Sequence, residues 1–300
     1  MRPLRTLVIY LGAVFIGGAL LAPWLYRLAQ MFSAAFPHVA GSPFQRFADR
    51  SLTLVALAGL WPLLRGLGAT SWRETGVVDL HGQWKKFFGG LLLGGLTLAI
   101  VAGGALKSSH RAWIPDLAAH TVVGTIFSAT ALAIVIAIVE EILFRGGIFG
   151  GLRRLLYWPI ALMASSAVYA LVHFLQPAEF SGPVTWNSGL ALLPRMLGGF
   201  ADFHALVPGF FTLLLMGALL GLAYQRTGNL YFSIGLHAGW IFWLRTYSTF
   251  TTGTASGATW FWGTGNLIDG WSTLIVLAVT LAIFKHLPLQ PAREPYAISG

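Results

Sequence analysis

Residues 119–145, AHTVVGTIFSATALAIVIAIVEEILFR, form an apolar run with no charged side chain between positions 121 and 139. A helix needs about 20 apolar residues to cross the hydrocarbon core of a bilayer, so this run is long enough to span a membrane. Similar runs lie near 6–25, 51–69, 87–106, 155–175, 207–224, 229–244 and 271–285. Because helices satisfy their own backbone hydrogen bonds in lipid, the sequence predicts an all-α, polytopic transmembrane helical bundle with about eight spans.

The composition also indicates an integral membrane protein. The chain of 300 residues is 56% hydrophobic and 10% charged, with a mean hydropathy of +0.72, which exceeds what one soluble core requires. It has no cysteine, which excludes disulfides, thiolate metal sites and a cysteine nucleophile. The net charge of +9 is assigned to short loops that face anionic lipid, so no nucleic-acid partner is expected.

Lysine and arginine are unevenly divided between the two sides of the predicted bundle. With the first residue in the cytoplasm, twelve of the 19 fall in inner segments and seven in outer ones. Since basic loops stay in the cytoplasm, we expect a multi-pass protein of the plasma (inner) membrane with both termini cytoplasmic. The first run is interpreted as a transmembrane helix rather than a signal peptide, because no small-x-small cleavage site follows it.

Three long connections separate the predicted spans. Residues 70–86 carry mixed charge and two tryptophans, as an interfacial segment would. Residues 176–206 contain three prolines and several glycines and are predicted to be a loop. Residues 247–270, rich in Thr, Gly and Trp, are predicted to be an outer interfacial loop.

Three charged residues, Glu140, Glu141 and Arg145, lie inside a predicted span. An ionised carboxylate at bilayer depth costs several kcal/mol, roughly 2.5–3.5 on insertion scales, so such residues usually face a polar protein interior. Glu141 precedes Arg145 by four residues, the favourable order for a helical ion pair. Glu140 is rotated by about 100° from Glu141 around the helix and has no local cation. We therefore predict that Glu140 faces a functional site.

Two histidines are predicted to lie at a similar depth. Glu140 is up to about 20 Å below the surface marked by residues 153–154, and His173 is roughly 20 Å from the turn before its helix. His237 lies eleven residues beyond Arg226, or roughly 16 Å deep. Each histidine alone is more often a packing residue, but one carboxylate and two imidazoles at one level favour a site. Such groups can activate water as general base and acid, or hold zinc, and both routes lead to hydrolysis.

Three ordered motifs on three spans resemble a known family. They are Glu140-Glu141-x-x-x-Arg145, Tyr169-x-x-x-His173, and His237 within YQRTGNLYFSIGLHAGW. They are similar to the EExxxR, FxxxH and HxxxN series of the CPBP family of intramembrane proteases, also called the Abi or type II CAAX-prenyl endopeptidase (Rce1-like) family. The resemblance covers roughly residues 119–245.

The resemblance implies a role for each residue. Glu140 and His173 would activate the water, Glu141 and Arg145 would support them, and His237 would stabilise the oxyanion of the tetrahedral intermediate. The expected reaction is endopeptidase cleavage of a membrane-associated peptide or protein, with prenylated C-terminal tripeptides as the family's eukaryotic substrates. We favour a mechanism that requires no cofactor. Zinc held by Glu140, His173 and His237, which would make the protein a metalloprotease, stays open as the alternative.

Two positions depart from the family pattern. Tyr169 replaces Phe and adds a hydroxyl, whereas Ile241 stands where the family has an Asn four residues after His237. Loss of an oxyanion donor typically lowers the rate by about 10²- to 10³-fold. The Tyr169 hydroxyl and the indole N–H of Trp240 are the two candidate substitutes, and both are assigned supporting roles.

Two other functions remain as alternatives. Buried Glu and His also occur in ion-coupled transporters, although the sequence shows no second copy of the Glu-Glu-x-x-x-Arg segment, as an internal repeat would. A catalytically weak or inactive membrane scaffold is motivated by Ile241. An HExxH zinc motif is absent from the sequence. We divide the chain into N-terminal helices with an interfacial segment (1–118), a CPBP-like protease core (119–245), and an outer loop with a C-terminal helix (246–300).

Overall fold

Helices dominate the structure, a computed structural model that describes residues 2–176, 178–255 and 258–286. Five apolar helices in this part of the chain are long enough to cross a membrane: Leu4–Met31, Phe44–Gly66, Trp84–Lys107, Ala119–Leu152 and Phe203–Thr227. Three further apolar runs form the helices Trp158–Val172, Tyr231–Phe250 and Trp271–His286. The predicted all-α polytopic bundle is therefore confirmed, and the chain is an integral membrane protein.

The chain folds into two compact units. The first unit comprises Met1–Thr70 and Leu171–Phe203, and the second comprises Ser71–Ala170 and His204–Gly300. These limits differ from the three consecutive segments expected from the sequence (1–118, 119–245 and 246–300), because residues 171–203 group with the first seventy residues. The division at 118 and 245 stays a prediction about function.

The first unit is built on two long helices that pack against each other. Its elements are α1 (Arg2–Gly12), the π-helix η1 (Ala13–Gly17), α2 (Gly18–Met31), α3 (Pro37–Ala40), α4 (Phe44–Gly66), α9 (Ser188–Leu192) and the 3₁₀-helix η4 (Arg195–Phe200). The predicted loop 176–206 therefore contains two short helices. α9 packs on α2 and α4, and Gly189 permits this, because a Cβ there would lie 1.9 Å from the Ala19 carbonyl oxygen.

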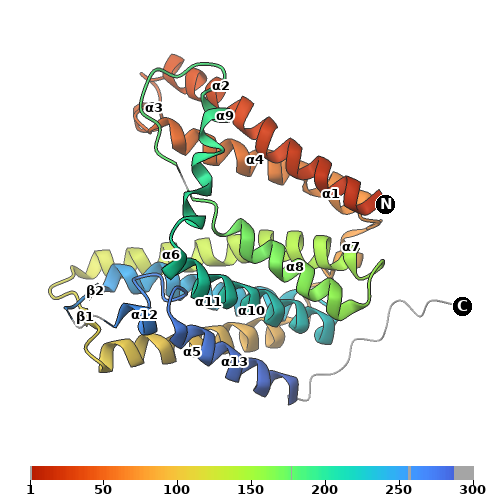
Figure 1. Cartoon of the computed structure of the whole chain (residues 1–300), viewed down its shortest axis with the longest axis vertical. Coiled ribbons are helices and arrows are strands. Elements are labelled where there is room, and N and C mark those ends of the chain that lie inside the picture. Colours follow the sequence, from red (N-terminus) through yellow and green to blue (C-terminus); the bar gives the residue numbers. More distant parts are fainter. Residues whose placement is uncertain (1, 177, 256–257, 287–300) are drawn as a thin grey trace, which may run out of the picture. The chain divides into compact units, whose positions relative to one another are not determined.

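The second unit holds the remaining helices and a small sheet (Figure 1). Its elements are η2 (Trp72–Thr75), α5 (Trp84–Lys107), β1 (Arg111–Trp113), α6 (Ala119–Glu141), the π-helix η3 (Ile142–Phe149), α7 (Gly150–Leu152), α8 (Trp158–Val172, whose last two residues belong to the first unit), α10 (Phe203–Thr227, whose first residue does), α11 (Tyr231–Phe250), β2 (Thr251–Gly253), α12 (Thr259–Trp262) and α13 (Trp271–His286). β1 and β2 pair antiparallel with Arg111 opposite Gly253. The predicted outer loop 247–270 thus includes a strand and a short helix.

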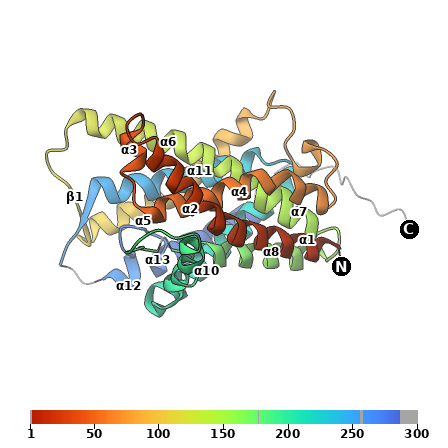
Figure 2. The same cartoon turned by 90° about the horizontal axis from the view of Figure 1, so that it is seen from above.

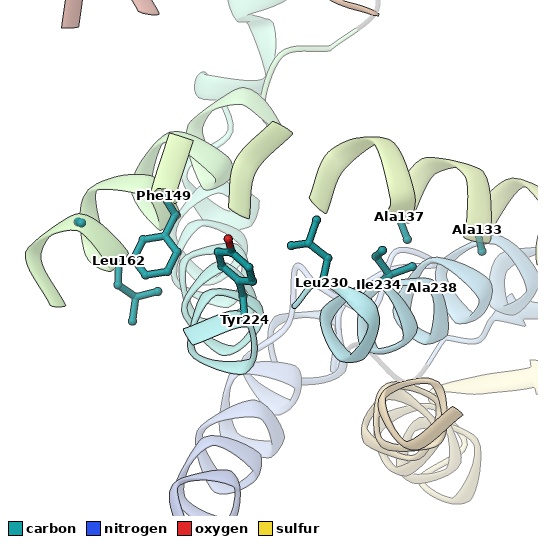
Figure 3. Packing of buried hydrophobic residues seen from close by; sticks show 9 residues of the cluster. Ala133, Ala137, Phe149, Leu162, Tyr224, Leu230, Ile234 and Ala238 are labelled. Atoms are coloured by element: carbon teal, nitrogen blue, oxygen red, sulfur yellow. The ribbon is translucent and has the colours of Figure 1, made fainter. Parts of the chain in front are cut away.

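Helix α11 lies against both α5 and α6, and this packing positions the site described below (Figure 2). The α5–α11 contact is close enough to require glycine, because a Cβ on Gly94 would lie 2.2 Å from the Leu236 carbonyl oxygen. On the other side, the small side chains of Ala133 and Ala137 in α6 pack in one hydrophobic cluster with Ala238 of α11 (Figure 3). Both neighbours therefore hold α11 at short range.

Candidate active site

The two adjacent glutamates are the last residues of α6, and the helix continues from them as the π-helix η3. The buried face of α6 repeats every four residues at Ala129, Ala133, Ala137 and Glu141. Glu141 thus extends an alanine stripe into the interior, and its side chain is 0% exposed, whereas that of Glu140 is 26% exposed. π-helical turns are rare, and those that occur often lie at functional sites.

Glu141 and Arg145 form the ion pair that their spacing predicted, with 2.9 Å between Oε1 and Nη1. The guanidinium is 1% exposed, so its charge is almost wholly removed from solvent. Its Nη2 donates to the Gly217 carbonyl of α10 at 3.4 Å, and its Cζ lies 4.5 Å from the centroid of the Tyr169 ring. The π-helix therefore carries a buried cation fixed to three neighbouring groups.

His237 joins this pair from α11. Its Nδ1 lies 2.9 Å from the same Oε1 of Glu141, and its Nε2 lies 3.8 Å from Oε2 of Glu140. Because a carboxylate only accepts, the hydrogen-bond network assigns the Nδ1 hydrogen to the bond with Glu141. In the neutral imidazole this leaves Nε2 as an acceptor.

Tyr169 of α8 completes the cluster in the second unit. Its hydroxyl lies 3.3 Å from Nε2 of His237, the nitrogen that accepts a hydrogen bond in the neutral tautomer. The buried ring packs edge-on against Phe144 with 5.1 Å between centroids, and lies under the Arg145 guanidinium. Packing thus fixes the direction of the phenol toward His237.

The second candidate oxyanion donor points elsewhere. The indole Nε1 of Trp240 donates to Oγ1 of Thr97 on α5 at 2.8 Å, which uses the one hydrogen that an indole can donate. Ile241 packs against the hydrophobic cluster of α6 and α11. Of the two substitutes named from the sequence, the structure places only Tyr169 beside His237.

His173 belongs to the first unit and lies in the turn directly after α8, with an exposed side chain. The sequence predicted it inside a helix, but α8 ends at Val172. The proline at position 177 does not set this end, because it disfavours the helical conformation only at residue 176, four residues after Val172. The pairing of His173 with Glu140 stays a prediction, since the two residues lie in different units.

The bond between Glu141 and His237 is the part of the site that sequence reasoning missed. Glu141 was assigned to Arg145 alone, although one carboxylate oxygen accepts from both partners. The alanines at 129, 133 and 137 were the available signal, because they place Glu141 on the face of α6 that packs against α11. The contacts of Arg145 with Gly217 and of Trp240 with Thr97 join different helices, so no residue spacing in the sequence could predict them.

A metal site was the alternative reading of the same residues. Within the described part of the chain, no group of three His, Asp or Glu side chains is placed to hold a metal ion. The predicted zinc set also needs His173 from the other unit. Zinc binding by Glu140, His173 and His237 therefore stays a prediction.

Comparison with protein families identifies the segment that holds this cluster. Residues 122–243 match the family described as type II CAAX prenyl endopeptidase, Rce1-like, which confirms the resemblance seen in the motifs. The match runs from α6 into α11 and includes the five clustered residues Glu140, Glu141, Arg145, Tyr169 and His237. Neither the curated proteins nor the solved structures gave a match to the chain. The family supports a membrane-bound hydrolase of the CAAX-protease type in general.

Proposed function

We propose that this chain, whose residues 122–243 carry an Rce1-like domain, is a membrane-embedded endopeptidase that cleaves a membrane-associated peptide or protein. The observation that carries the proposal is the cluster of Glu140, Glu141, Arg145, Tyr169 and His237, which come from α6, η3, α8 and α11. A purely structural ion pair would need only Glu141 and Arg145. Glu140 and His237 add a second carboxylate and a titratable ring.

Glu140 is the proposed base for water. It is the more accessible carboxylate of the pair, and Glu141 is committed to Arg145 and His237. A general base must reach its water from a partly solvated position, and it contributes about 10²- to 10⁴-fold to the rate. His173 is proposed as its partner, as the resemblance implies. Attack of the water oxygen on the carbonyl carbon forms the C–O bond of a tetrahedral intermediate. The proton taken from water then passes to the leaving amine, and the C–N bond breaks as the carbonyl re-forms.

Tyr169 is the proposed donor that offsets the Asn absent at position 241. His237 can donate from Nε2 to an oxyanion only as the imidazolium, because Glu141 holds the Nδ1 hydrogen. The Tyr169 hydroxyl is neutral and already aimed at the same nitrogen, 3.3 Å away. Once His237 is the imidazolium, Nε2 no longer accepts from the Tyr169 hydroxyl, so both groups can donate to the charge on the tetrahedral intermediate.

The deciding experiment is cleavage of a library of membrane-anchored peptides by the purified full chain. The library contains matched prenylated and unprenylated peptides, so that the assay also tests whether the enzyme requires a prenyl group on its substrate. Glu140→Gln is expected to lose cleavage while keeping the fold, whereas Glu179→Gln, an identical change at an exposed position of the first unit, keeps wild-type cleavage. Parallel assays with a chelator separate the cofactor-free mechanism, which should be unaffected, from the zinc alternative.

Other outcomes point to the alternative functions. Wild-type cleavage by folded Glu140→Gln would refute the assigned base. If the wild type has no peptidase activity but carries out ion-coupled flux in reconstituted vesicles, and Glu140→Gln loses that flux, the protein is a transporter. A wild type with neither activity would support a membrane scaffold, as the substitution at Ile241 suggested. Location in the plasma (inner) membrane with cytoplasmic termini is tested by labelling the two ends, of which residues 287–300 lie outside the described part of the structure.

A further inference from the structure

A separate cavity of about 400 Å³ lies in the first unit, at the start of α4. It is lined by His38, Val39, Ser42, Arg46, Phe47 and Arg50. Three of these side chains carry nitrogen donors and two are apolar. The lining contains no acid among the described residues, although Asp49 lies on the same helix.

The two arginines occupy one face of α4, four residues apart. Like charges at this spacing repel each other, and neither guanidinium forms an ion pair with a residue in the described part of the chain. Arg46 Nη1 donates to Ser42 Oγ at 3.3 Å, and Ser42 Oγ donates to the His38 carbonyl at 3.2 Å. Ser42 therefore holds the Arg46 guanidinium at the cavity, and Arg50 interacts electrostatically with its neighbour Asp49 without a close ion pair.

The surroundings of the cavity are those of a membrane interface. α4 is a candidate membrane span that begins at Phe44, so the cavity lies where the helix enters the bilayer. The chain just before it exposes large apolar side chains: Met31, Phe32, Phe36 and Val39. An exposed apolar segment beside basic side chains is typical of a surface that contacts headgroups and acyl chains together.

We propose that this cavity binds the phosphate of an anionic phospholipid. Arg46 and Arg50 supply forked donors for the phosphate oxygens, and His38 adds a third donor at the rim. Val39 and Phe47 contact the first carbons of the acyl chains. The site is independent of the peptidase cluster, so it stands or fails without regard to the function proposed above.

The test is a lipid titration of the delipidated full chain in a neutral detergent, followed by thermal unfolding and by native mass spectrometry. The probes are phosphatidylglycerol, phosphatidylcholine and inorganic phosphate. Each arginine near an anionic surface strengthens binding by roughly fivefold, so Arg46→Gln with Arg50→Gln should weaken phosphatidylglycerol binding by about 30-fold. The matched control, Arg5→Gln with Arg27→Gln, removes the same charge from the first unit outside the cavity and should bind as the wild type does.

Each result decides for or against the proposal. The charge-retaining pair Arg46→Lys with Arg50→Lys should bind within a few-fold of the wild type, which separates lost charge from lost folding. Equal phosphatidylglycerol affinity in the glutamine pair and its control would overturn the site. Phosphatidylcholine binding as tightly as phosphatidylglycerol, or inorganic phosphate stabilising the protein equally at the same concentration, would overturn the assignment to an anionic lipid.

Discussion

Removing one member of the buried Glu141–Arg145 pair should destabilise the second unit at least as much as removing both. The Arg145 guanidinium is 1% exposed and donates to Glu141 at 2.9 Å. In Glu141→Leu it keeps only the Gly217 carbonyl, at 3.4 Å, as a hydrogen-bond acceptor among the described residues. Breaking a buried pair in this way costs about 3–5 kcal/mol, because a charge remains without compensation. His237 loses its Nδ1 acceptor in the same variant.

The assay is a double-mutant cycle of Glu141→Leu and Arg145→Met, read as the free energy of unfolding in mixed detergent micelles. Each single variant is expected to lose about 3–5 kcal/mol, and the double variant no more than the larger single loss, because no unpaired charge is left. Glu74→Leu with Arg154→Met is the control cycle, since that pair is 3.2 Å apart but about a quarter exposed on each side. It should give a coupling of about 1 kcal/mol or less. Additive losses at Glu141 and Arg145 would refute the reasoning.

Two further substitutions test the site and its framework. Tyr169→Phe should lower kcat on a cleaved substrate by about 10²- to 10³-fold with a stability loss of only about 0.5–1.5 kcal/mol. Trp240→Phe removes the bond to Thr97 and leaves a cavity at a buried position, so it should cost more stability but leave kcat nearly unchanged. Equal kcat losses in the two variants would contradict the assignment. Gly94→Ala should destabilise by about 1–3 kcal/mol through overpacking against α11, while Gly103→Ala on the same helix, where a Cβ meets nothing within 4 Å, should be neutral or stabilise by up to about 1 kcal/mol; thermal unfolding of both variants checks this.

The spans and the ion pair could be predicted because both depend on spacing along one helix. Apolar length sets where the chain can cross a bilayer, and every predicted run contains a helix in the structure, although that of 155–175 covers only Trp158–Val172. Glu141 and Arg145 meet because four residues bring side chains to one face, although the chain at Arg145 is π-helical rather than α-helical. The proximity of Glu140 and His237 was predicted from their similar depth in the membrane, and their Oε2 and Nε2 atoms lie 3.8 Å apart.

The contacts between helices could not be predicted in the same way. Depth gives the level of a side chain but not its direction, so the second bond of Glu141, to His237, was missed. The same limit applies to Trp240, whose donor faces Thr97 on another helix. The end of α8 before His173 depends on the packing of residues 171–203 with the first unit, which no local pattern encodes.

Because of the π-helix Ile142–Phe149, the second unit should tolerate a single-residue deletion within this helix but not one before Glu140. A π-turn holds one more residue than an α-turn, so a chain that is one residue shorter between Phe144 and Phe149 can close the same segment with ordinary turns. A deletion upstream of Glu140 instead rotates both glutamates by about 100° and turns Glu141 away from α11. Length variation among related chains should therefore fall after Arg145, never between the alanine stripe and the glutamates.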